Sequence, residues 1–164
     1  MLAIVVSAWI SLALSNRARR ETLKDIRDAA RRKELETADA LTTLAEKSLA
    51  LQKSIAAKLQ NREAVAEAAS DQLPFDMAML DGLERALFRV PLHEMPGELL
   101  TLTLILRETV RQCRMKIEMA FQFHREMDAR QYQDLFDTLA NMNESLTETV
   151  KDFRTKREAL TRPF

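Results

Sequence analysis

Glycine is nearly missing from this chain, which has two glycines, four prolines and one cysteine in 164 residues. Sheets depend on tight turns, and tight turns draw on glycine, proline and asparagine. A multi-stranded sandwich, a barrel or a glycine-rich phosphate loop therefore has almost no material here. The single cysteine, Cys113, permits no disulfide within the chain and no two-cysteine metal motif. These absences predict an all-α fold.

An excess of charge of one sign is also missing, because 25 basic and 25 acidic side chains balance. Apolar residues make up 46% of the chain, which favours burial in one domain over a solvated tail. Aromatic residues make up only 5%. Nucleic-acid binding is typically supported by interleaved aromatic residues and a net basic domain. We therefore expect no nucleic-acid partner.

Charged side chains are absent from residues 1–16, whereas residues 17–33 carry eight basic side chains against three acidic ones. An uncharged helix of this length spans about 24 Å, and snorkelling flanks extend its reach towards the roughly 30 Å hydrocarbon layer. We therefore predict an N-terminal single transmembrane helix over residues 1–16, in contact with membrane lipid. The predicted anchor residues are Leu2, Ile4, Val5, Val6, Trp9, Ile10, Leu12 and Leu14, and the predicted headgroup and topology residues are Arg17, Arg19 and Arg20.

The arginines follow the apolar run, and this order sets the predicted orientation. We therefore predict a single-pass membrane protein, and the positive-inside rule places the bulk of the chain on the cytoplasmic side. A cleaved signal, cut near Ala13-Leu14-Ser15, is the main alternative, but signal peptides carry their positive charge before the apolar run. A mitochondrial presequence is a third possibility, although such segments are amphipathic. The arginines either bind anionic headgroups or only fix orientation.

The remainder divides into three predicted segments. Residues 17–72 form one long amphipathic helix, because they lack glycine and proline and repeat apolar residues at helical spacing. Residues 73–97 hold three prolines and both glycines, which predicts a short connector helix and a turn. Residues 98–162 form either one long helix with a local unwinding or a helical hairpin, since the apolar spacing slips once. We expect an elongated helical bundle or antiparallel coiled coil.

That slip lies between Met127 and Tyr132, where the apolar spacing jumps by five residues. The apolar run Leu99–Leu106 is too short for a second membrane span and is predicted to be deeply buried in the bundle. Apolar residues at steps of three and four form the predicted packing seam. The seam residues are Leu41, Leu44, Leu51, Ile55, Leu102, Leu106, Val110, Ile117, Leu135, Leu139 and Leu146.

Residues capable of catalysis are sparse. On one helix Cys113 and His124 would lie about 16 Å apart, which is too far for a nucleophile and its base. His124 and Asp128 have the spacing to share a metal, and nearby methionines such as Met115 and Met119 suggest copper. Core packing explains these residues better, because methionine commonly fills helical interfaces. We expect no enzymatic activity, no cofactor and no metal.

These features favour a structural role. We expect a membrane-anchored coiled-coil scaffold or adaptor that mediates self-association or partner binding at the membrane surface. Its partners would be a second copy of the chain or another helical protein, with charged flanks setting the register. The alternative is a ligand-sensing helical bundle on the outer side of the membrane, which the arginine flank opposes.

Overall fold

Every regular element is helical in the computed structural model, which describes residues 2–70 and 77–162. This arrangement confirms the predicted all-α class. The α-helices are α1 (Leu2–Lys58), α2 (Arg62–Ala69), α3 (Met77–Arg89), α4 (Gly97–Phe123) and α5 (Ala129–Thr161), and a short 3-10 helix, η1 (Leu92–Glu94), precedes α4.

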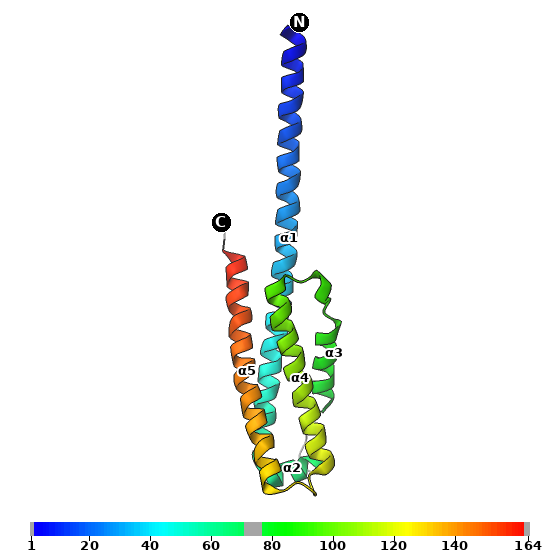
Figure 1. Cartoon of the computed structure of the whole chain (residues 1–164), viewed down its shortest axis with the longest axis vertical. Coiled ribbons are helices and arrows are strands. Elements are labelled where there is room, and N and C mark those ends of the chain that lie inside the picture. Colours follow the sequence, from blue (N-terminus) through cyan, green and yellow to red (C-terminus); the bar gives the residue numbers. More distant parts are fainter. Residues whose placement is uncertain (1, 71–76, 163–164) are drawn as a thin grey trace.

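The helices form an elongated bundle (Figure 1). α1 and α4 run in one direction, α3 and α5 run in the other, and α2 lies across the closed end (Figure 1). α5 packs along the second half of α1 more extensively than any other pair of helices pack together. α1 then continues well beyond the end of the bundle, so the molecule consists of a compact body and one projecting helix.

Two apolar clusters fill the body. The first lies near the closed end and includes Ile55, Ile117 and Leu139. The second lies nearer the projecting helix and includes Leu106 and Phe153. Each cluster combines residues of α1, α4 and α5, which explains why none of these helices needs to be stable alone. Their packing identifies the fold as a helical bundle.

The long helix expected over residues 17–72 is divided at residues 59–61, where α1 has ended and α2 has not begun. Asn61 has an extended backbone, and its side chain accepts a hydrogen bond from the Ala64 amide at 2.8 Å. This is a standard N-cap, and it satisfies a donor that a helix start leaves free. The first residues of the predicted connector segment, 73–76, lie outside the described residues.

Residues 98–162 form the hairpin, one of the two alternatives, with α4 and α5 joined by a short turn. Asp128 begins α5 through a capping box: its carboxylate accepts from the Gln131 amide, and the Gln131 side chain accepts from the Asp128 amide, both at 2.8 Å. The five-residue jump in apolar spacing therefore marks a chain reversal, with the cap supplying the local signal.

The anchor prediction has a different outcome. Within the described part of the chain, no helix is long and apolar enough to cross a membrane. Between Leu2 and the charge at Arg17, α1 rises only about 22 Å, less than the roughly 30 Å of hydrocarbon. The side chains of the eight predicted anchor residues, Leu2, Ile4, Val5, Val6, Trp9, Ile10, Leu12 and Leu14, lie outside the described ones.

Candidate interaction surfaces

The projecting part of α1 is the most prominent feature of the molecule, and we call residues 2–30 the α1 arm (Figure 1). Residues 17 and 19–30 are all exposed. Leu23 and Ile26 retain 65% and 60% of their accessible surface, so no part of the bundle covers this apolar stripe. At about 1.5 Å per residue, the arm is roughly 44 Å long.

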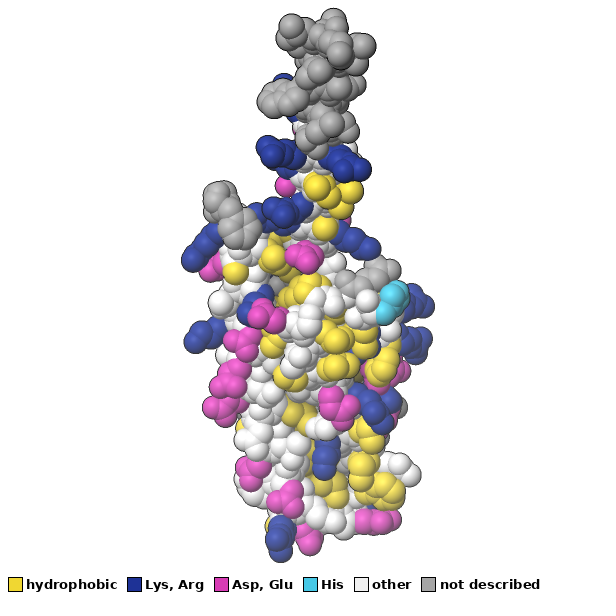
Figure 2. All heavy atoms as spheres, turned by 45° about the horizontal axis from the view of Figure 1, so that its top comes forward, with side chains coloured by type: hydrophobic (Ala, Val, Ile, Leu, Met, Phe, Trp, Pro, Cys, Tyr) yellow, Lys and Arg dark blue, Asp and Glu magenta, His cyan; other side chains and the backbone are white. Residues whose placement is uncertain are grey.

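Basic side chains cluster on this arm, visible as dark blue atoms around the projecting helix (Figure 2). Arg17 pairs with Glu21 one turn away at 3.2 Å, and both side chains are largely exposed. Such an exposed pair contributes little to stability. The predicted headgroup residues Arg17, Arg19 and Arg20 thus lie on one projecting helix with their backbone clear of the bundle.

The junction between arm and body is closed by Arg31. Its guanidinium donates to the Leu160 carbonyl at 3.0 Å and also to the Arg162 carbonyl. The Leu160 carbonyl belongs to the last turn of α5 and Arg162 is its C-cap residue, so both lie where a helix end leaves acceptors unsatisfied and where the helix dipole favours a positive charge. Arg31 therefore fixes the end of α5 against α1 at the base of the arm.

Ion pairs tie α5 to its neighbours along the same region. Arg154 of α5 contacts Glu46 of α1 at 2.7 Å, and Arg157 pairs with Asp39 one turn nearer the arm. Lys156 pairs with Glu98 at the start of α4. These charged side chains of α5 therefore pair with helices of the same chain, and they help to set the register of α5 against α1 and α4.

The predicted packing seam lies in the core of this single chain. Leu44, Leu51 and Leu102 are partly buried, and the other members of the seam are fully buried. The buried members are Leu41, Ile55, Leu106, Val110, Ile117, Leu135, Leu139 and Leu146. A partner chain must therefore use a different surface from these residues.

Cys113 is a core residue bonded to a buried amide. Its thiol donates to Oε1 of Gln52 at 2.6 Å, and Gln52 donates in turn to the Leu139 carbonyl at 3.3 Å. Burial raises the pKa of the Cys113 thiol to about 12, opposed by the Gln52 hydrogen bond. A protonated, buried thiol is a poor nucleophile, which agrees with a packing role.

His124 lies at the end of α4, where its ring donates to the Phe121 carbonyl and its own carbonyl accepts from the Tyr132 hydroxyl. Asp128 is used as the cap of α5. Among the described side chains, no three of His, Cys, Asp or Glu converge on a possible metal position. His124 and Asp128 therefore stabilise the hairpin turn.

Arg107 has a role that its sequence neighbourhood did not predict. It is only 9% exposed, and it donates to the carbonyls of Leu87 and Val90 at 2.8 and 2.7 Å, and to that of Phe88 at 3.3 Å. These acceptors lie at the end of α3, so Arg107 caps a helix twenty residues earlier in the chain. Burial lowers the pKa of its guanidinium.

Arg114 makes a second link between α3 and α4. Its guanidinium contacts Glu84 of α3 and Glu118 of its own helix, each at 2.5 Å. The hydrogen bond with Glu84 is the main cause of a raised Arg114 pKa. Together with the Arg107 cap, this contact fixes α3 along one side of α4 and leaves another side of α4 open.

That open side is the outer face of α4, which we define by Ile105, Glu108, Gln112, Met115, Met119 and Phe123. Its apolar members are exposed, with Met119 at 53% and Ile105 at 42%. Figure 2 shows hydrophobic side chains running down the visible face of the bundle in this region.

Two sequence predictions are corrected on this face. The run Leu99–Leu106 is buried on one side only, because Leu104 and Ile105 face solvent. Met115 and Met119 are exposed and do not fill the core. Because the run Leu99–Leu106 is apolar on all sides of the helix, it presents more than one apolar face. The bundle covers only one of these faces.

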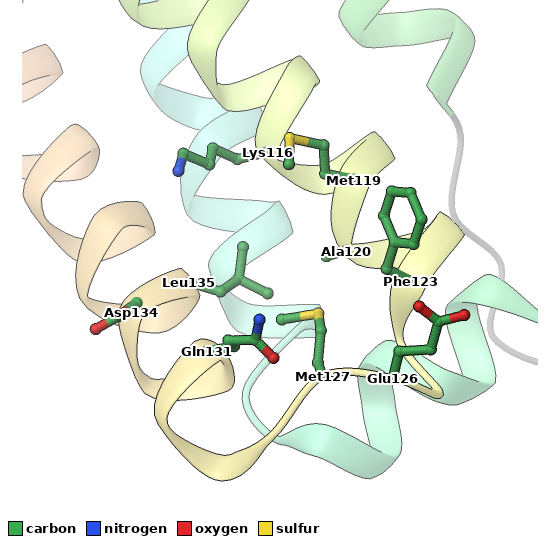
Figure 3. Close-up of a pocket in the computed structure, with 9 residues that line it drawn as sticks. All are labelled: Lys116, Met119, Ala120, Phe123, Glu126, Met127, Gln131, Asp134 and Leu135. Atoms are coloured by element: carbon green, nitrogen blue, oxygen red, sulfur yellow. The ribbon is translucent and has the colours of Figure 1, made fainter.

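A groove of about 470 Å³ adjoins the lower end of this face (Figure 3). Met119 and Phe123 of α4 line one wall, Leu135 of α5 lines the other, and Met127 closes the end at the turn. The groove is partly open to solvent, and its lining is mainly apolar. It extends the outer face of α4 towards α5.

Comparison with known proteins gives no relative whose function could help to interpret these surfaces. No protein-family model, curated protein or solved structure matches the chain. The functional interpretation therefore depends on the geometry and chemistry of the surfaces themselves.

Proposed function

We propose that this chain is a membrane-attached helical scaffold, held at the bilayer surface by the α1 arm and presenting the bundle to partners. The observation that carries the proposal is the arm itself, a helix that leaves the bundle with basic and apolar side chains exposed together. A helix with these two kinds of side chain binds anionic lipid through charge and apolar burial.

The chemistry of the arm changes along its length. Residues 1–16 are uncharged, and they enter the bilayer in this proposal, while Arg17, Arg19 and Arg20 remain at the headgroups. Leu23 and Ile26 lie one to two turns beyond Arg20 on the side of the bundle, and both side chains are exposed. The positive-inside rule then places the bundle on the cytoplasmic side.

Membrane attachment is tested by vesicle flotation of the full chain with neutral and anionic vesicles. Replacing Arg17, Arg19 and Arg20 with glutamine removes three charges near the surface, each worth about 1 kcal/mol. We expect the variant to lose most of its preference for anionic vesicles. Glutamine at Lys47, Lys53 and Lys151, which are exposed on the bundle, is the matched control and should bind as the original does.

A chain lacking residues 2–16, which keeps Arg17, Arg19 and Arg20, tests the apolar opening separately. We expect the full chain to resist extraction with alkaline carbonate and the shortened chain to be released. Equal release of both chains would contradict insertion of the opening, and a reporter fused to the C-terminus that responds outside the cytoplasm would contradict the orientation.

A further inference from the structure

Along the outer face of α4, charged and apolar residues are spaced symmetrically about one central position. Gln112 lies at the middle of the face, with Glu108 four residues before it, and Lys116, at the edge of the face beside the groove, lies four residues after it. Both charged side chains are exposed, and the Glu108 carboxylate also accepts from Gln112 at 2.8 Å and pairs with Arg111 at 3.7 Å on its own helix. Apolar residues lie at equal distances further out, with Ile105 seven residues before Gln112 and Met119 seven residues after it.

We propose that the outer face of α4 binds the same face of a second copy, with the two helices antiparallel about the level of Gln112. In this arrangement Glu108 of one copy lies at the level of Lys116 of the other, and the contact occurs twice. Ile105 and Met119 of the two copies meet in the same way. A twofold interface must be complementary to itself, and the two pairs of positions 105 with 119 and 108 with 116 satisfy that condition.

A parallel pairing fails the same requirement. It would place Glu108 opposite Glu108 and Lys116 opposite Lys116, and like charges across a helix pair are unfavourable. The antiparallel pairing also covers the exposed Met119 and Ile105 side chains, whose solvation is otherwise unexplained.

The neighbouring helices leave room for this contact. α3 is fixed to a different side of α4 by the Arg107 and Arg114 contacts. The groove beside Phe123 and Leu135 provides a depression next to the seam. Because the surface lies on the body of the molecule, this inference does not depend on attachment of the α1 arm to lipid.

The experiment measures the mass of the detergent-solubilised full chain by sedimentation, with no lipid vesicles present. We expect a dimer, and we expect Glu108→Lys or Lys116→Glu alone to raise its dissociation constant at least about tenfold. The double exchange, Glu108→Lys with Lys116→Glu, restores opposite charges and should return the constant to near its original value. Glu144→Lys, an exposed change on α5, is the control and should have no effect.

Crosslinking establishes the direction of the two helices. When chains carrying Ile105→Cys are mixed with chains carrying Met119→Cys, an antiparallel dimer forms the mixed disulfide, whereas a parallel dimer joins like positions. A monomer at tens of micromolar, a double exchange as weak as the single variants, or disulfides only between like positions would each overturn the proposal. Lipid binding measured separately by flotation would survive any of these results.

Discussion

At the scale of single residues, two buried polar side chains determine how neighbouring helices are placed. Arg107 satisfies three carbonyls at the end of α3, and Gln52 links Cys113 to the carbonyl of Leu139. Each acts on an element distant in sequence. Buried polar groups of this kind must be matched, because leaving a partner unsatisfied is more costly than the bond is favourable.

The Arg107 cap gives a residue-scale prediction. Arg107→Met keeps much of the apolar stem but leaves the carbonyls of Leu87, Phe88 and Val90 without their donor. We expect the free energy of unfolding to fall by about 1–3 kcal/mol in denaturant titrations. Arg85→Met, which removes only an exposed contact with Asp81, should change it by less than about 0.5 kcal/mol. Equal effects of the two changes would show that the cap contributes nothing.

At the scale of elements, the helix boundaries depend on individual caps. Asn61 starts α2 and Asp128 starts α5, and each lies in a stretch without glycine or proline. Sequence periodicity identifies where a helix buries a face, and it placed the seam residues at regular spacing. It detects boundaries less well, because one side-chain hydrogen bond at a cap is enough to start a helix.

Asp128→Ala tests the capping box. The change removes the acceptor for the Gln131 amide, and we expect the bundle to lose about 1 kcal/mol of stability in a denaturant titration. Asp152→Ala removes an exposed carboxylate from the same helix away from its start, so it should have an effect below about 0.5 kcal/mol. A loss at Asp152 as large as that at Asp128 would count against the cap.

The apolar run Leu99–Leu106 shows why the sequence predicted the candidate surfaces only in part. Its composition indicates that the run is buried. Which side of the helix is buried depends on the number and position of the helices packed around it. Arg107 has the same limitation, since its acceptors are brought close only when α3 folds back along α4. By contrast, the basic segment after residue 16 is visible directly, because charge counting requires no knowledge of packing.

At the scale of the whole molecule, the body and the α1 arm are energetically separate. Residues 17 and 19–30 contribute no buried side chain, and among the described side chains the core begins at Ala38. Removing residues 2–29 keeps Arg31 and its contacts with the end of α5. We therefore expect the free energy of unfolding to change by less than about 0.5 kcal/mol, while the helical circular dichroism signal decreases. A loss of several kcal/mol on this truncation would show that the arm supports the fold.

The parallel course of α1 and α4 in one chain has a geometric outcome for an antiparallel pair. Each arm leaves its own bundle beyond the N-terminal end of α4, so two copies joined antiparallel through α4 would extend their arms to opposite poles (Figure 1). Under the two proposals above, such a dimer would be a double-ended rod with one lipid-binding arm at each end.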